Sequence, residues 1–393
     1  MKILILSLSL FLSSIIFPLR AQESIKNLEK LHAELKAHYE ASDLPGFSIS
    51  VVNRMGNLVT SSHGYADVQK EIPYSSSSLQ NLGSVSKTVT GLALIKAIEH
   101  TDLTMFSPIN DFLPFEIHNP HFPDQPILVK QLANHTSSIL DTKYYGQSYV
   151  LQAEPDDLEG MHTDYLAFIR SHEKMELADF VKKILSKEGK WYKKKNFLKS
   201  APGSEKEYSN LNAAIAALIV EQSSGMSFRD FTRKYIFEPL KMKNTAWSFE
   251  ELGKEEQATL YFPSKLIVPK YGLNTYPDGG LVSNVDDLKK YLAEMIRAFR
   301  GESTYLSIRY AKLLLPGDDN DIRAFWGMGE KSRNIGHGGS DPGAQTDIQF
   351  NADTQIGRII LCNVNAEDNE TLWQQYREIH NIIAKYENKL LEP

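Results

Sequence analysis

Cysteine is scarce in this sequence, and its scarcity restricts how the chain can be held together. The single cysteine is Cys362, which lies inside the apolar run Ile359–Cys362. With one thiol the chain forms no intramolecular disulfide, so a packed core must stabilise it. We therefore expect Cys362 to be a small buried hydrophobic residue rather than a nucleophile.

An excess of positive charge is also lacking. The formal net charge is −6 over 393 residues. Such a chain has no overall electrostatic attraction to nucleic acid, so we expect no nucleic acid partner. The cluster of basic residues from Lys190 to Lys195 is interpreted as a solvated face.

Sequence patterns of several other enzyme classes are absent. The chain has no Gly-x-Ser-x-Gly elbow of the α/β-hydrolase type and no Gly-x-x-x-x-Gly-Lys loop for nucleotide phosphates. His118 and His121 stand in a proline-rich loop that offers too few further ligands for a metal ion. We expect neither a metal nor an organic cofactor.

Long apolar runs are scarce as well, except at the N-terminus. Lys2 precedes an apolar run of about 15 residues at positions 3–17. This run is short for a bilayer span and typical of a signal-peptide core, with cleavage expected after Ala21. The alternative is a retained membrane anchor. We expect a signal peptide at 1–21, export to the periplasm or the extracellular space, and no stable membrane insertion of the mature chain 22–393.

Hydrophobic periodicity predicts strands near both ends of the mature chain. Residues 46–53 and 58–62 are predicted to form a hairpin, and residues 346–350 and 356–363 two further strands. Helices are predicted over 24–39, 88–99 and 211–222 and at the C-terminus, where one face carries Trp373, Tyr376, Ile379, Ile383 and Leu390.

This order of elements predicts an α/β (α+β) fold. An antiparallel sheet built from both termini would be flanked by helices, with an all-helical subdomain inserted at about residues 100–200. Two lobes of this kind leave a cleft at their junction, which is a common place for a binding site. We expect the functional site at this junction.

Ser84 and Lys87 form a Ser-x-x-Lys pattern at the start of the predicted helix 88–99. Three residues make about one helical turn, so both side chains lie on one face, where a neutral amine can take the serine proton. Ser84 follows Gly83 and precedes an apolar stretch, so it stands at a buried helix N-terminus whose N–H groups can stabilise an oxyanion. The alternative is a serine that only caps the helix.

A second Ser-x-x-Lys pattern occurs at Ser171 and Lys174. Its neighbours Arg170 and Glu173 are charged, which is typical of an exposed surface. We therefore expect Ser84, and not Ser171, to be the nucleophile.

The segment Tyr208-Ser209-Asn210 precedes the predicted helix 211–222. Residues two apart in an extended segment point the same way, so Tyr208 and Asn210 can both face a cleft. A phenol near a lysine cation can relay a proton, and an asparagine can hold a lysine or a substrate amide. The alternative is a loop tyrosine that only packs its ring.

A glycine-rich segment follows at His337-Gly338-Gly339-Ser340. Successive glycines in a strand indicate close approach by a ligand or another backbone. Such a strand edge can bind a peptide-like substrate, offer the Ser340 N–H to an oxyanion, and bring a protonated His337 near a carboxylate. The alternative is an ordinary glycine-rich turn.

These three segments, in this order, resemble the motifs of the penicillin-recognising serine hydrolases. The chain is most similar to the class C beta-lactamase-related family, which includes D,D-carboxypeptidases, D-aminopeptidases, esterases and beta-lactamases. The resemblance covers about residues 25–385. It includes accessory segments at Leu132–Ser137, Phe237–Met242 and Gly279–Ser283.

The resemblance implies roles for the residues of the three motifs. Ser84 would be the acylated nucleophile, with Lys87 and Tyr208 as the general acid/base pair. Asn210 would orient the substrate or Lys87. The N–H groups of Ser84 and Ser340 would form the oxyanion hole, and His337 would replace a lysine of typical class C beta-lactamases.

Departures from the family pattern bear on the substrate. His337 in place of lysine removes a permanent charge. In the family that the chain resembles, peptidases and esterases more often carry histidine at this place, so the resemblance favours them over a beta-lactamase. Ser138 stands where glycine is usual, and residues 141–200 carry no recognisable family motif.

We therefore expect a serine hydrolase that cleaves amide or ester bonds of a small-molecule or peptide substrate through an acyl-enzyme. A D-amino-acid peptidase or carboxypeptidase, or an esterase, is favoured, with a beta-lactamase as the alternative. A second alternative is a non-catalytic envelope or peptidoglycan-binding module on the same fold. The sequence leaves the oligomeric state open.

Overall fold

A computed structural model describes residues 23–253, 257–317 and 322–390. The predicted signal peptide at 1–21, with its cleavage point after Ala21, lies outside the described residues and stays a prediction. Within the described ranges, no helix combines the length and the apolar character that crossing a membrane requires.

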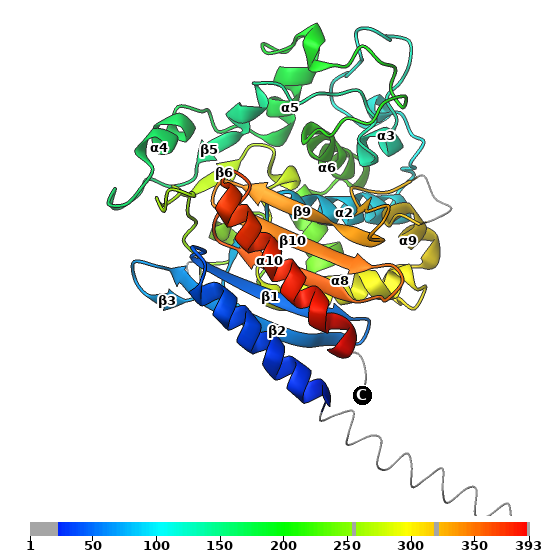
Figure 1. Cartoon of the computed structure of the whole chain (residues 1–393). Helices are drawn as coiled ribbons and strands as arrows, with labels where there is room; N and C mark the ends of the chain where they lie inside the picture. Colours follow the sequence, from blue (N-terminus) through cyan, green and yellow to red (C-terminus); the bar gives the residue numbers. More distant parts are fainter. Residues whose placement is uncertain (1–22, 254–256, 318–321, 391–393) are drawn as a thin grey trace, which may run out of the picture.

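A seven-stranded antiparallel sheet forms the centre of one lobe (Figure 1). Strand β1 pairs with β2 on one side and with β11 on the other, so the N-terminal hairpin is joined to the C-terminal strands, as predicted. In spatial order the strands are β3 (Ile72–Pro73), β2 (Gly56–Asp67), β1 (Gly46–Asn53), β11 (Gly357–Cys362), β10 (Ala344–Asn351), β9 (Asn334–Asp341) and β8 (Gly327–Met328).

Helices cover both faces of this sheet (Figure 1). The N-terminal helical residues 23–40 and α10 (Glu370–Tyr386) pack on one face, where they share a core with side chains of β1 and β11. Helix α8 (Val285–Phe299) contacts β1 and β11 and contributes to the larger core, which also contains α2 and α6. The helices predicted at the two ends of the chain are thus confirmed.

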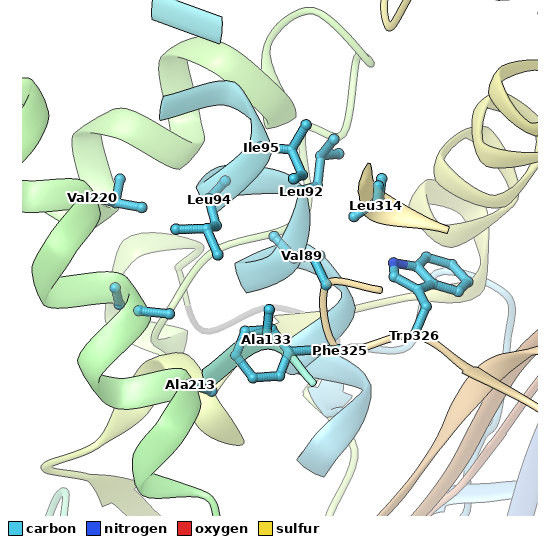
Figure 2. Packing of buried hydrophobic residues seen from close by; sticks show 14 of the residues in the cluster. Val89, Leu92, Leu94, Ile95, Ala133, Ala213, Val220, Leu314, Phe325 and Trp326 are labelled. Atoms are coloured by element: carbon cyan, nitrogen blue, oxygen red, sulfur yellow. The ribbon is translucent and has the colours of Figure 1, made fainter. Parts of the chain in front are cut away.

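Helix α2 (Ser86–His100) is buried on all sides along residues 86–97. A helix that is apolar all round lies inside a core rather than at a surface. In Figure 2, Leu94 points toward Val220 of α6 (Leu211–Ser224), and Leu92 points toward Leu314. Full burial of such a side chain stabilises the fold by about 1.5–3 kcal/mol. This packing fixes the N-terminus of α2, where Ser84 and Lys87 lie.

The segment 100–200 is loop-rich and carries short helices, but it is not all-helical as predicted. Strand β5 (Tyr149–Leu151) pairs with β6 (Tyr271–Leu273), which lies far along the chain. Three residues are too few to show a two-residue period, so the sequence carries no signal for this strand.

The remaining α-helices and strands are α3 (Val129–Ala133), α4 (Thr163–Arg170), α5 (Leu177–Leu185), α7 (Phe228–Thr232), α9 (Ile308–Leu314), β4 (Gln80–Asn81) and β7 (Val282–Ser283).

Cys362 is buried at the end of β11, as its apolar neighbours predict. Burial raises the pKa of its thiol to about 12, because the thiolate would lose its hydration. The side chain therefore serves packing in the core that β1 and β11 share with α10.

Candidate active site

Ser84 lies in a short 3-10 turn, Gly83–Val85, immediately before α2. Gly83 has a φ of +53°, a left-handed conformation that residues with a side chain rarely adopt. The Thr346 hydroxyl on β10 donates a hydrogen bond to the Leu82 carbonyl at 2.7 Å and ties the turn to the sheet. Ser84 is therefore held at the N-terminus of a buried helix, as predicted.

Lys87 lies on the first turn of α2, and its side chain is fully buried. Its Nζ donates hydrogen bonds to Ser84 Oγ at 2.9 Å and to the main-chain oxygen of Asp278 at 2.6 Å. The Ser-x-x-Lys spacing thus produces the expected contact. Asp278 belongs to the turn Tyr276–Asp278, and no sequence pattern identifies it as a partner of Lys87.

Tyr208 approaches Ser84 from the loop before α6. Its hydroxyl donates a hydrogen bond to Ser84 Oγ at 3.0 Å, and Lys87 Nζ lies 5.3 Å from the centre of its ring. Tyr208 is 44% exposed, so it forms the solvent side of this trio and Lys87 the buried side. Ser84 Oγ therefore lies between two groups that can accept and return a proton.

His135 supports Tyr208 by ring stacking, with the two centroids 4.5 Å apart. The Ser209 N–H donates to His135 Nδ1 at 3.3 Å, so this nitrogen carries no proton. Burial lowers the pKa of His135 to about 3, and a protonated Lys87 adds to the effect. The sequence placed His135 in an accessory segment only and gave no sign that it stacks on Tyr208.

Asn210 is the residue before α6, and its side-chain amide is held by Asp141. The Asn210 Nδ2 donates to Asp141 Oδ2 at 2.8 Å, and the Asn210 backbone N–H donates to the same oxygen at 2.7 Å. The Asp141 carboxylate also accepts from Ser209 Oγ and Leu211 N, so it caps the N-terminus of α6. The resemblance implies that Asn210 orients either the substrate or Lys87. Among the described residues the hydrogen bonds of Lys87 go to Ser84 and Asp278, so the contact with Lys87 is not formed, and orientation of a substrate stays a prediction.

The glycine-rich segment His337–Ser340 lies in β9, as the prediction of a strand edge requires. Strand β10 pairs along the whole of β9, whereas β8 pairs only with Ile335 and Gly336 at its beginning. Beyond that point, β9 contacts the turn that carries Ser84.

This contact is close enough to require glycine at two positions. A Cβ on Gly339 would lie 2.2 Å from the Leu82 oxygen and 3.2 Å from the Ser84 nitrogen. A Cβ on Gly83 would lie 3.2 Å from the Ser340 nitrogen. The backbone nitrogens of Ser84 and Ser340 therefore belong to two segments in direct contact, and side chains here would force those segments apart.

His337 is partly buried, with its Nδ1 2.5 Å from the Gly338 oxygen, so Nδ1 carries the proton in this contact. Burial lowers the pKa of His337 to about 4, and a protonated Lys87 adds to the effect. The imidazole is therefore neutral at neutral pH. This does not support the expectation that a protonated His337 attracts a carboxylate under these conditions.

A hollow of about 660 Å³ lies elsewhere, lined by parts of β5, β6 and α5 together with Arg229 of α7 and Trp247. Its lining does not include Ser84, Lys87 or Tyr208. The candidate site is therefore identified by the contacts around Ser84 and not by the volume of this hollow.

Comparison with known proteins gives related sequences over most of the chain. The family model described as Beta-lactamase matches residues 30–381. Protein flp of Staphylococcus aureus (strain MW2) is 22% identical over 334 residues, which cover 82% of this chain and 60% of that protein. Penicillin-binding protein 4* of Bacillus subtilis (strain 168) is 27% identical over 335 residues, which cover 79% of this chain and 66% of that protein. The chain thus spans about 60% to 66% of the length of these relatives.

Solved structures share the fold. The octameric penicillin-binding protein homologue from Pyrococcus abyssi has a TM-score of 0.66 at 22% identity, covering 92% of this chain and 79% of its own. The D-amino acid amidase from Ochrobactrum anthropi SV3 has a TM-score of 0.65 at 19% identity, covering 92% and 99%. Together with the family match, these findings show that the chain belongs to the beta-lactamase family of penicillin-recognising serine hydrolases.

Proposed function

We propose that this chain is a serine hydrolase that cleaves amide or ester bonds through an acyl-enzyme on Ser84. The observation that carries the proposal is the pair of contacts to Ser84 Oγ, 2.9 Å from Lys87 Nζ and 3.0 Å from Tyr208 Oη. The Ser84 hydroxyl has a proton acceptor, Lys87, on its buried side and a proton relay, Tyr208, on its exposed side. This arrangement suits nucleophilic attack.

In acylation, Ser84 Oγ attacks the substrate carbonyl carbon while its proton passes to the neutral amine of Lys87. The carbonyl oxygen becomes an oxyanion, which the N–H groups of Ser84 and Ser340 stabilise. Collapse of the tetrahedral intermediate breaks the bond to the leaving group. The proton returns from Lys87 through Tyr208 to the departing nitrogen or oxygen, and the acyl group stays on Ser84.

Deacylation repeats these steps with water as the nucleophile. Water attacks the ester carbonyl of the acyl-enzyme, its proton passes to Tyr208 and Lys87, and the same two N–H groups hold the oxyanion. Ser84 Oγ then leaves and recovers its proton, and the carboxylic acid product departs. The enzyme returns to its starting state.

The neutral His337 favours a substrate without a carboxylate at this strand edge. A pKa of about 4 leaves no permanent positive charge there. We therefore propose esters, the amides of D-amino acids and D-amino acid peptides without a carboxylate at this edge as the substrate class, and the shared fold with a D-amino acid amidase makes the amides a specific candidate. Beta-lactams are the alternative substrate.

The test compares kcat/KM on a nitrophenyl ester, a D-phenylalanine amide, a D-Ala-D-Ala peptide and a chromogenic cephalosporin. We expect turnover of the ester or the amide, loss of that turnover in Ser84→Ala, and no change in Ser171→Ala, the matched control with the same sequence spacing. Preference for the cephalosporin would identify a beta-lactamase instead. Absence of turnover on all four substrates would favour a non-catalytic binding module.

Export is part of this proposal and rests on the apolar run at residues 3–17. Expression of the full chain in a bacterial host, followed by cell fractionation and N-terminal sequencing, tests it. We expect an exported protein that begins at Gln22, whereas a chain retained in the membrane with residues 3–17 intact would contradict cleavage.

A further inference from the structure

Lys87 is surrounded by neutral hydrogen-bond partners although its side chain is fully buried. Its amine donates to a serine hydroxyl and to a main-chain carbonyl, neither of which carries charge. When Lys87 takes the proton of Ser84 it becomes a cation in this buried place. A buried cation is unfavourable unless negative charge lies nearby.

Two buried carboxyl groups belong to residues next to the proposed catalytic residues. Asp278 presents its main-chain oxygen to Lys87, and Asp341 follows Ser340 at the end of β9. Their side chains are almost completely buried, with 1% and 5% of the residue surface exposed. Burial raises the pKa of Asp278 to about 7 and that of Asp341 to about 6, while the charge of Lys87 acts in the opposite direction on both.

A tyrosine from the segment 141–200 holds each of these carboxyl groups. The Tyr145 hydroxyl donates to Asp278 Oδ1 at 3.0 Å, and the Tyr149 hydroxyl donates to Asp341 Oδ1 at 2.6 Å. The other oxygen of each carboxyl group has no hydrogen-bond partner of normal length among the described residues. The Thr275 hydroxyl is still close enough to Asp278, and the Tyr271 hydroxyl to Asp341, to lower the pKa of each carboxyl group. Buried carboxyl groups that are only partly paired are costly, and such groups are often kept for function.

We propose that Asp278 and Asp341 are positioning residues that supply the counter-charge of Lys87, and that Tyr145 and Tyr149 hold them in place. This inference rests on the proposed function. It assigns a role to a segment without any family motif, because the two tyrosines connect that segment to the catalytic lysine and to the strand that carries Ser340.

Other titratable groups lie near Lys87 and Asp278 and bear on the charge of this site. The pKa values of His135 and His337 are both lowered, so these rings are neutral at neutral pH. Tyr208 is the proton relay of the proposed mechanism. Asp141 is a further carboxyl group in this neighbourhood and raises the pKa of Asp278, and its oxygens accept from four donors at the start of α6, none of which is Lys87.

The test is the pH profile of kcat/KM on the nitrophenyl ester, whose acid limb belongs to the coupled groups around Ser84. Asp278→Asn removes a negative charge and so favours the neutral amine, which moves the acid limb to lower pH by about one unit. The same change makes Lys87 a weaker base, so the plateau falls by about tenfold.

Tyr145→Phe provides a second variant that keeps the carboxyl group. The Tyr145 hydrogen bond lowers the pKa of Asp278, so its loss leaves Asp278 less ionised at any given pH. We expect the acid limb to move in the same direction as in Asp278→Asn, by a smaller amount. Tyr376→Phe is the matched control, because the buried Tyr376 hydroxyl has no hydrogen-bond partner among the described residues and lies in the core that β1 and β11 share with α10.

A purely structural role would lower activity equally at all pH values. The inference is therefore overturned if Asp278→Asn and Tyr145→Phe leave the acid limb in place or move it to higher pH. If Asp278→Asn does not fold, Tyr145→Phe carries the test alone. Failure of the proposed function is a different result, because wild-type protein would then hydrolyse no substrate.

Discussion

Ser84–Lys87 and Ser171–Lys174 share one sequence spacing and lie in contrasting surroundings. Lys87 is fully buried on the first turn of α2 and donates a hydrogen bond to Ser84 Oγ. Ser171 is exposed at the end of α4, where its hydroxyl donates to the Phe168 carbonyl, and Lys174 lies in the irregular segment beyond that helix.

The difference shows what a Ser-x-x-Lys pattern needs before it can work. The helix must continue from the serine through the lysine, because only then do the two side chains share a face. A core must also hold the lysine, since an exposed amine is hydrated and mobile. Both conditions are met at Ser84, where a turn runs directly into α2, and neither is met at Ser171.

Lys87→Ala is the variant from which we expect the largest effect on activity. We expect kcat/KM on the ester to fall by about 10⁴-fold, because the group that accepts the Ser84 proton is removed. Lys174→Ala should retain wild-type kcat/KM. Equal losses in the two variants, or retained activity in Lys87→Ala, would contradict the assignment of Lys87 as the base.

Gly339→Ala tests the contact between β9 and the turn that carries Ser84. Its Cβ would lie 2.2 Å from the Leu82 oxygen, so the strand or the turn must shift, which would separate the two N–H groups proposed as oxyanion donors. We expect a fall in kcat of about 10²-fold, comparable to the loss of one oxyanion donor. Gly338→Ala is the control, because its nearest neighbour would be 3.9 Å away. A larger loss in Gly338→Ala than in Gly339→Ala would argue against this geometry.

His135 belongs to the buried surroundings of Ser84, and its burial can be tested through the pH dependence of the free energy of unfolding. Its folded pKa of about 3 lies below the unfolded value of 6.5. Protonation of His135 therefore leaves the free energy of unfolding unchanged above pH 6.5 and lowers it as the pH falls toward 3. Between pH 7 and 5 the loss amounts to about 2 kcal/mol.

The measurement is urea unfolding of wild type and His135→Gln at pH 7 and pH 5. Between these pH values, the free energy of unfolding of the variant should fall by about 2 kcal/mol less than that of wild type, because the variant lacks the titrating ring. His118→Gln, at an exposed position, serves as the control and should retain the wild-type pH dependence. An unchanged pH dependence in His135→Gln would show that this ring is not held neutral by burial.

Much of the fold was predictable because its signals are local. The strands at 46–53 and 346–350 and the helices at 88–99 and 211–222 have clear periodicity, and β1, β10, α2 and α6 lie at these places. The Ser84–Lys87 contact was also predictable, since a helix converts spacing into proximity.

The rest depended on contacts between distant segments. Asp141 caps α6 from about 70 residues away, and Tyr145 reaches Asp278 across more than a hundred. Neither pair has a spacing that a pattern can detect, and β5 is too short to show a period. The stacking of His135 on Tyr208 likewise appears only after folding.

Covalent labelling by a fluorophosphonate, followed by peptide mapping, tests the central claim most directly. Wild-type protein and Ser171→Ala should each gain a single adduct on the peptide that contains Ser84, and Ser84→Ala should gain none. An adduct of equal yield in Ser84→Ala, or one mapped to another serine, would contradict Ser84 as the nucleophile.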